Sequence, residues 1–341
     1  MPNYMYVSLQ DDDKILIFTV DEATGRLDRQ QDVEVTGGPA PLAIDPERRF
    51  LYVGRRGTRE LSSFRIDPGT GGLSLIGTVS LREGEPVYMA TDRRGRFVLS
   101  AYYHQSKTAV HPIDDNGVAG TPPIEWLHTA SGAHCIQTDP SNRFAFVPHI
   151  AGKGPNAIFQ FRFDEGTGRL TPNSPPTVSP EGELGPRHFC FHPSRDILYF
   201  SDEQGCSVTA YRLDSSSGTL APFQTVSTLP ENFSGSNTCS QIQITPSGKF
   251  LYAPNRGHNS VACFSIHAST GQLTSVGRVA TEPVPRALSL DPEGNFLFVA
   301  GLESGRLASY RVDNESGELS PLEVYHVGNK PMWVLVTKLP D

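Results

Sequence analysis

Short apolar segments recur along the chain, and each follows a polar turn that usually contains proline. Six copies are DPERRFLYVG (45–54), TDRRGRFVLS (91–100), DPSNRFAFVP (139–148), HPSRDILYFS (192–201), TPSGKFLYAP (245–254) and DPEGNFLFVA (291–300). The segments are rich in Phe, Tyr, Val and Leu, residues that favour a pleated, packed strand. No stretch shows convincing helical i, i+3, i+4, i+7 spacing with caps, so the pattern predicts an all-β chain.

A second repeated feature lies roughly midway between these segments: a turn of the form Asp-x-x-x-Gly-x-Leu. Clear copies are DEATGRL (21–27), DEGTGRL (164–170), DSSSGTL (214–220) and DNESGEL (313–319). Including looser copies, the turn glycine occurs seven times, 46 to 53 residues apart, at Gly25, Gly71, Gly117, Gly168, Gly218, Gly271 and Gly317. An alternating segment precedes each apolar segment and another strand follows it, so each unit predicts four antiparallel strands.

Four strands in a unit of this length are the signature of a β-propeller blade. Seven units account for nearly all of the 341 residues, so we predict one seven-bladed β-propeller domain spanning residues 1–341. We expect YMYVSL (4–9) to pair with PMWVLVTKL (331–339), which would be the innermost strand of the last blade. Closing the ring with the N- and C-terminal strands removes the exposed edges of a linear array.

Composition narrows the classes of partner. The chain carries 29 Lys and Arg against 37 Asp and Glu and has no run of five basic residues, so we expect no nucleic-acid partner. No apolar run approaches a membrane span, and the N-terminus lacks the features of a secretory signal. Five cysteines without a Cys-x-x-Cys pair are typical of reduced thiols. We therefore expect a cytoplasmic chain, acting as a monomer or a weak homo-oligomer.

One face of the ring is predicted to carry function. Successive strands alternate in direction, so the regular turns share one face, whereas the connections into strand one and out of strand two share the other. Aligning the blades places three basic or titratable residues at the entrance to strand one: His134, Arg187 and Arg286. The exits of strand two add Tyr103, His149, Glu203, Arg256 and His258.

These residue types favour an anionic ligand and acid–base chemistry. Arginines bind anions through paired hydrogen bonds, and Glu203 or His134 has the chemistry of a general acid or base. Arg187 and Arg286 enter inward-pointing strands, where an unpaired charge is costly, which favours a functional role. Two other interpretations stay open: Glu203 as a structural counter-ion, and His134 as a satisfied core histidine. Three further exit residues are interpreted as solvated loop positions: Arg55, Arg56 and His104.

Other chemistries lack their sequence signatures. The chain has no nucleophile elbow, no phosphate-binding glycine loop and no zinc-protease motif. It also has no dense cluster of Asp, Asn or Glu that would demand a divalent metal. We therefore expect no metal, no cofactor and no Ser or Cys nucleophile.

Several stretches resemble the propeller-type 6-phosphogluconolactonases, the seven-bladed lactonase family. They are GPRHFCFHP (185–193), LPENFSG (229–235), ITPSGKFLYAPNRGHNSVACFSI (244–266) and PMWVLV (331–336). The family also contains fungal carboxymuconate cyclases, whose proposed site has one His, two Arg and one Glu. By motif, the resemblance assigns those roles to His134, Arg187, Glu203 and Arg256. The chain departs from the family in a longer loop, PHIAGKGPNAIF (148–159), where His149 and Lys153 are expected to help bind substrate.

The resemblance and the aligned residues together predict a metal-independent hydrolase that acts on an anionic sugar lactone. The first candidate substrate is 6-phosphogluconolactone, which implies carbohydrate metabolism and the pentose phosphate pathway. In this hypothesis Arg187, Arg256 and Arg286 hold the anionic groups and polarise the carbonyl. Glu203 or His134 activates water. Tyr103 and His258 complete the expected substrate contacts. Two alternatives stay open, a carboxymuconate-type lactonising enzyme and a non-catalytic propeller that binds a protein or metabolite.

Overall fold

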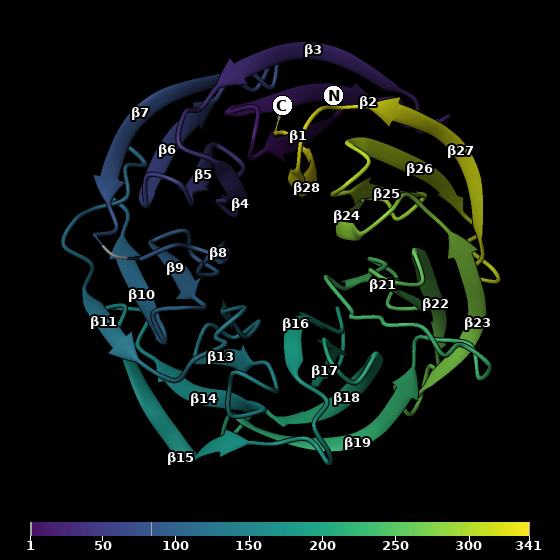
Figure 1. The fold of residues 1–341 in the computed structure, drawn as a ribbon. Coiled ribbons are helices and arrows are strands. Elements are labelled where there is room, and N and C mark those ends of the chain that lie inside the picture. The colour runs from purple at the N-terminus through teal and green to yellow at the C-terminus, as the bar shows by residue number, and fades with distance from the viewer. Residues whose placement is uncertain (1, 83, 341) are drawn as a thin grey trace.

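In the part of the chain that the structure describes, all regular secondary structure consists of β-strands. This computed structural model describes residues 2–82 and 84–340, in which 28 strands form seven four-stranded antiparallel sheets. The sheets stand as blades around a central axis (Figure 1). The prediction of a seven-bladed β-propeller is therefore confirmed.

The first four blades follow the chain from the innermost strand to the outermost. Blade 1 has β4 (Pro39–Ile44), β5 (Phe50–Arg55), β6 (Glu60–Ile66) and β7 (Leu73–Ser80). Blade 2 has β8 (Tyr88–Thr91), β9 (Phe97–Tyr102), β10 (Lys107–Pro112) and β11 (Glu125–His128). Blade 3 has β12 (Gln137–Thr138), β13 (Phe144–His149), β14 (Ala157–Phe163) and β15 (Leu170–Val178). Blade 4 has β16 (Pro186–Phe191), β17 (Ile197–Asp202), β18 (Ser207–Asp214) and β19 (Thr219–Ser227).

The last three blades complete the ring. Blade 5 has β20 (Gln243–Ile244), β21 (Phe250–Asn255), β22 (Ser260–Ile266) and β23 (Leu273–Ala280). Blade 6 has β24 (Pro285–Leu290), β25 (Phe296–Gly301), β26 (Arg306–Val312) and β27 (Leu319–His326). Blade 7 joins both ends of the chain and has β28 (Pro331–Lys338), β1 (Asn3–Leu9), β2 (Lys14–Val20) and β3 (Leu27–Glu34).

The pairing of β1 with β28 closes the ring. Their antiparallel register runs from Asn3 opposite Lys338 to Leu9 opposite Pro331. The two termini consequently lie close together in the ring (Figure 1). The predicted closure by the N- and C-terminal strands is correct.

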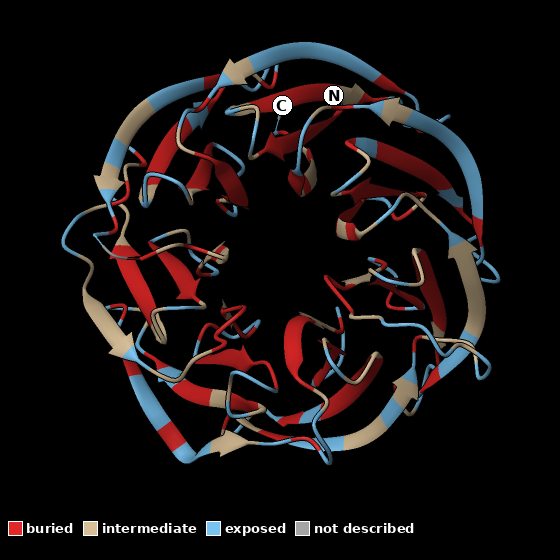
Figure 2. Ribbon diagram, in the orientation of Figure 1, coloured by how far each residue is buried: buried red, intermediate tan, exposed pale blue. Residues whose placement is uncertain are grey.

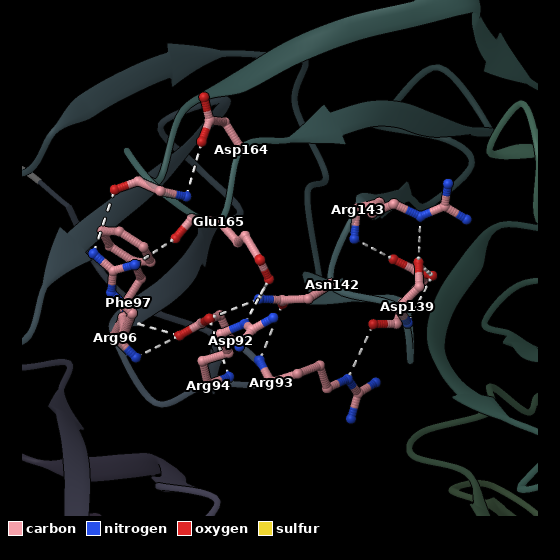
Figure 3. Close-up of polar contacts among 12 residues, drawn as sticks. Asp92, Arg93, Arg94, Arg96, Phe97, Asp139, Asn142, Arg143, Asp164 and Glu165 are labelled. Atoms are coloured by element: carbon pink, nitrogen blue, oxygen red, sulfur yellow. Dashed lines mark hydrogen bonds and ion pairs between the residues drawn. The ribbon is translucent and has the colours of Figure 1, made fainter.

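The aspartates of the mid-blade turns fix the turn backbone. Asp92 Oδ1 accepts hydrogen bonds from the backbone nitrogens of Arg96 and Phe97 at 2.6 and 2.9 Å. Its second oxygen accepts a hydrogen bond of 2.9 Å from Asn142 Nδ2, which belongs to the equivalent turn of the next blade (Figure 3). A turn-forming aspartate thus also connects neighbouring blades on this face.

The repeated glycines allow adjacent blades to approach closely. Gly25 has a φ of 74°, and a Cβ built on it would lie 2.4 Å from the ring of Phe296 in the preceding blade. Gly117 meets Phe50 in the same way, and its carbonyl oxygen accepts a hydrogen bond of 3.1 Å from the Tyr52 hydroxyl. The 46- to 53-residue spacing therefore marks a contact between blades as well as a turn.

The hydrophobic core lies between neighbouring blades. The inner strands are mostly buried, whereas the outermost strands expose much of their length (Figure 2). In β1 all seven residues are buried, whereas in β3 only Leu27 is. Because the blades supply packing along their whole height, residues at the strand ends are free to differ from blade to blade.

Candidate active site

Two equivalent positions in each blade meet at one mouth of the ring. The entrance position, at the start of the innermost strand or just before it, holds Ala40, Val87, His134, Arg187, Ser240, Arg286 and Met332. The exit position, directly after the second strand, holds Gln10, Arg56, Tyr103, Ile150, Glu203, Arg256 and Leu302.

One backbone hydrogen bond fixes this pairing in six of the seven blades. The exit residue donates its N–H to the carbonyl oxygen two residues before the entrance position. In blade 4, for example, Glu203 N lies 2.7 Å from Gly185 O. The same bond, at 2.9–3.2 Å, is made by Gln10, Arg56, Ile150, Arg256 and Leu302. The backbone therefore sets where each side chain begins, and the sequence decides which chemical group stands there.

Two arginines hold Glu203 at the centre of the predicted cluster. Arg187 Nε lies 2.7 Å from Glu203 Oε2, and Arg256 Nη2 lies 3.2 Å from Glu203 Oε1. Arg256 also donates a hydrogen bond of 2.8 Å to the carbonyl oxygen of Cys239. The first contact is an ion pair without the alignment of a hydrogen bond, because neither of its two atoms has a hydrogen-bond partner in the described residues. Arg187 is only 1% exposed, so this charge depends on its carboxylate partner.

His134 joins the cluster through an aromatic contact with Tyr103 and a second one with His188. Its ring centroid lies 5.6 Å from that of Tyr103 and 5.2 Å from that of His188. Burial, followed by the positive charges of Arg187 and other basic neighbours, lowers the pKa of His134 well below its usual value. Its Nδ1 has no hydrogen-bond partner among the described residues. The imidazole is therefore neutral at pH 7.

Tyr103 lies near the charged groups as well. Burial raises the pKa of its hydroxyl, and the negative charge of Glu203 adds to this effect while Arg187 opposes it. The phenol is therefore neutral at pH 7 and can donate a hydrogen bond. Four of the five residues brought together come from strand exits or entrances of blades 2 to 4, and Arg256 comes from blade 5.

Arg286 and Arg56 line a pocket together with Arg187. Arg286 is the second residue of β24, at the entrance position of blade 6, as the alignment predicted. Arg56 corrects the interpretation of a solvated loop residue, because it faces this pocket and forms an ion pair with Glu85. Its position was readable from the sequence, since Arg56 and Arg256 occupy the same exit position in blades 1 and 5.

The family model for "Lactonase, 7-bladed beta-propeller" matches residues 3–336. The chain belongs to this lactonase family. A 6-phosphogluconolactonase of Pectobacterium atrosepticum is 36% identical over 340 residues, covering 99% of this chain and all of the relative. A 6-phosphogluconolactonase of Yersinia pestis is 34% identical and covers 98% of both chains.

Solved structures share the fold of this lactonase. A periplasmic gluconolactonase of Pseudomonas aeruginosa superimposes over the full length of both chains with a TM-score of 0.91 at 24% identity. A protein from Bacteroides fragilis described as a putative 6-phosphogluconolactonase has a TM-score of 0.89, also at 24% identity, and 98% of each chain is covered. At this level of identity the likeness supports the fold alone.

His149 does not join the cluster, although the sequence analysis placed it there. It is fully buried as the last residue of β13, one position before the exit residue Ile150. Its Nδ1 lies 3.0 Å from the carbonyl oxygen of Val147, and its Nε2 lies 2.9 Å from the Thr129 hydroxyl. Both ring nitrogens are engaged within the protein, so we leave His149 out of the proposed site.

His258 and Lys153 also lie outside the group of contacting side chains. His258 Nδ1 lies 2.7 Å from Ser260 Oγ, and its ring packs edge to face against Phe233 of the LPENF loop. Lys153 is exposed in the longer blade 3 loop. Their roles in substrate binding stay predictions.

Three aromatic rings that no sequence pattern indicated form a floor beneath the cluster. Tyr88, His188 and Trp333 come from the innermost strands of blades 2, 4 and 7, with ring centroids 5.0 to 6.1 Å apart. His188 and Trp333 line the arginine pocket, and all three rings line a cavity on the other side. The floor therefore separates the mouth that carries the cluster from the rest of the central channel.

Residues 2–82 and 84–340 hold no group of three or more His, Cys, Asp or Glu side chains placed to bind a metal ion. Nor do they contain a helix long and apolar enough to cross a bilayer.

Proposed function

We propose that this lactonase hydrolyses 6-phosphogluconolactone to 6-phosphogluconate. The observation that carries the proposal is the ion pairing of Glu203 with both Arg187 and Arg256 at the mouth of the ring. The names of the full-length relatives support the choice of substrate. The chemistry required is the hydrolysis of an activated ester, for which positioning, a base and an oxyanion partner are sufficient.

The reaction assigns separate tasks to the charged groups. Water attacks the lactone carbonyl carbon and gives up a proton, and negative charge develops on the carbonyl oxygen. Arg187 and Arg256 carry the positive charge that stabilises this oxygen. The bond from the carbonyl carbon to the ring oxygen then breaks, and that oxygen takes up a proton to become the hydroxyl of the open-chain acid.

Two residues compete for the role of base. Glu203 is negatively charged, but both of its oxygens contact arginines in this structure. His134 is neutral and its buried Nδ1 has no partner among the described residues, but its lowered pKa makes it the weaker base. We assign the base to Glu203 first, with His134 relaying the proton taken from water to the leaving oxygen, and the reverse assignment is the alternative.

A lactonising enzyme of the carboxymuconate type is the second candidate. It rests on the presence together of His134, Arg187, Glu203 and Arg256, the four residues that the resemblance assigned to that site. Ring closure adds a carboxylate oxygen of the substrate to a conjugated C=C bond and a proton to carbon. Arginines that hold the carboxylates and a Glu or His that transfers the proton serve this reaction as well as hydrolysis. A non-catalytic propeller is disfavoured because the full-length relatives are named as enzymes.

The deciding experiment compares substrates with the purified full-length protein. The loss of 6-phosphogluconolactone is measured against the uncatalysed reaction, in parallel with carboxymuconate and with neutral lactones. We expect acceleration that is greatest for the phosphorylated lactone and is abolished by Glu203→Gln. Acceleration of carboxymuconate lactonisation alone would reassign the enzyme, and no acceleration with any of them would reject the proposal.

The proposal extends to the domain, the cellular compartment and the pathway of the protein. We propose that residues 1–341 act as one catalytic domain in a reducing compartment, the cytoplasm. The five cysteines support this because all are unpaired, including the buried Cys135, Cys239 and Cys263. The protein would then act in carbohydrate metabolism, in the pentose phosphate pathway.

A further inference from the structure

The mouth of the ring carries more positive charge than its carboxylates neutralise. Four arginines gather there: Arg56, Arg187, Arg256 and Arg286. Two carboxylates pair with them, Glu203 with Arg187 and Arg256, and Glu85 with Arg56. His134 and His188 add no charge at pH 7, because burial and the arginines lower the pKa of both well below the usual value. Four cations and two anions leave an excess of two positive charges.

Arg286 is the arginine that lacks a counter-ion. In the described residues its side chain forms no ion pair, whereas the other three arginines do. Burial lowers the pKa of its guanidinium, and so do the charges of Arg187, Arg256 and Arg56. A guanidinium nevertheless stays protonated under physiological conditions, so the pocket holds a cation in unfavourable surroundings. Such a site gains stability when an anion enters it.

The surplus charge comes from other blades than the Glu203 ion pairs, although Glu203 is near enough for its charge to raise the pKa of Arg286. Arg286 and Arg56 belong to blades 6 and 1, the two neighbours of blade 7, whose own entrance and exit residues are the uncharged Met332 and Gln10. In the ring, β24 and β4 flank β28, and β16 lies across the axis from them (Figure 1). Arg187 extends from β16 into the same pocket as Arg286 and Arg56. The three arginines therefore line the same narrow space.

We propose that Arg286 and Arg56 form the subsite for the phosphate group of the substrate, while Glu203, Arg187 and Arg256 act on the lactone. A phosphate monoester carries nearly two negative charges at pH 7, which matches the excess at the mouth. Glu85 holds Arg56 in place and keeps the excess at two positive charges. The assignment deepens the proposed function and rests on it for the identity of the lactone, but the anion site itself is tested separately.

The direct test measures binding of inorganic phosphate by calorimetry, independently of any turnover. The variants are Arg286→Gln and Arg56→Gln in the full-length protein. Arg55→Gln is the matched control, because Arg55 neighbours Arg56 but pairs with Glu60 at 3.0 Å and does not line the pocket. We expect the Kd for phosphate to rise roughly 10- to 100-fold in both variants, as for a lost charge-assisted hydrogen bond, and to stay unchanged in the control.

The kinetic arm uses the phosphorylated lactone and the same lactone without its phosphate. We expect Arg286→Gln to raise KM for the phosphorylated lactone by the same factor as the Kd for phosphate. The preference for the phosphorylated over the unphosphorylated lactone should fall accordingly. Phosphate binding that is absent in the wild type, or unaffected by Arg286→Gln, overturns the subsite. Equal losses with both lactones would also overturn it and would place Arg286 at the carbonyl. Expected phosphate binding without any lactone turnover leaves the subsite standing and rejects only the proposed function.

Discussion

Trp333 meets Tyr88 edge to face, with ring centroids 5.4 Å apart and ring planes at 70°. Trp333 lies on β28, close to the end of the chain, whereas Tyr88 begins β8 in blade 2. Blade 1 separates these two blades in the ring, so the contact crosses the mouth instead of following the blade-to-blade core. The C-terminal strand therefore closes the ring and also supplies part of the floor of the candidate site.

Deleting residues 331–341 removes β28 and leaves β1 without the strand it pairs with from Asn3 to Leu9. The deletion also removes Trp333 and exposes apolar surface of blades 6 and 1. We expect the midpoint of thermal unfolding to fall by at least about 10 °C, or the chain to aggregate. Differential scanning calorimetry and gel filtration measure both. Deleting only residues 340–341, which follow β28, is the control, and a 331–341 deletion as stable and monomeric as the full chain would contradict the closure.

Glu203→Gln tests the assignment of the base. Glutamine keeps the size of the side chain but removes its charge and basicity, so we expect kcat to fall on the order of 10²–10⁴-fold with little change in KM. The variant also leaves the buried Arg187 without its carboxylate, so folding must be checked by circular dichroism. Glu60→Gln, which breaks the ion pair with Arg55, is the matched control. A folded Glu203→Gln variant with near-normal kcat would transfer the role of base to His134.

Arg187→Ala removes a cation that contacts both the bound lactone and the transition state. We expect KM to rise and kcat to fall together, because a displaced lactone loses its geometry for attack. Arg187→Lys is expected to restore little of either, since an ammonium group cannot reproduce the planar fork of a guanidinium. Steady-state kinetics on both variants decides this, and full rescue by lysine would show that only charge matters.

His149→Gln separates a structural histidine from a substrate contact. Burial lowers the pKa of His149 from 6.5 to about 4, so between these values the unfolded chain binds a proton that the folded chain does not. The contribution of His149 to the free energy of unfolding is therefore fully present above pH 6.5. It is lost as the pH falls toward 4, and the total loss is about 3 kcal/mol. We expect the glutamine variant to lose this part of the pH dependence in urea unfolding. Its KM should stay within about 2-fold of the wild-type value, and a large rise in KM would return His149 to the site.

Chelator treatment tests the expectation that no metal is required. Because guanidinium groups are assigned to polarise the carbonyl, we expect activity to be unchanged after dialysis against excess chelator. Loss of activity that Ca²⁺ or Zn²⁺ restores would replace the arginine roles proposed for the carbonyl. The assay is the same lactone hydrolysis, run before and after dialysis.

The fold was predictable because its signals are local and repeated. An aspartate that binds the backbone of its own turn, as Asp92 does, and a glycine that meets the previous blade, as Gly25 does, must recur at a fixed spacing in the sequence. The central pair of the candidate site could be predicted from the same alignment of blades. Arg187 and Glu203 occupy the entrance and exit of one blade, and antiparallel pairing brings such positions together.

The errors arose where register or distance mattered more than residue type. His149 lies one residue before the exit position of its blade, which buries it, whereas Arg56 occupies that position in blade 1 and faces the pocket. The floor of Tyr88, His188 and Trp333 joins blades that are not neighbours, so no periodic spacing in the sequence reports it. The pairing of Arg56 with Glu85 depends on side-chain directions, which a single sequence does not encode.

The backbone hydrogen bond at the strand exits has a consequence for how such enzymes diversify. Since the bond involves only main-chain atoms, the identity of the exit residue is decoupled from the integrity of the blade. Ile150 and Leu302 occupy exits that carry no charge in this chain, yet they start from the same backbone position as Glu203 and Arg256. Ile150 is buried, whereas Leu302 is half-buried, so a charged group is accommodated at the mouth more easily at position 302 than at position 150.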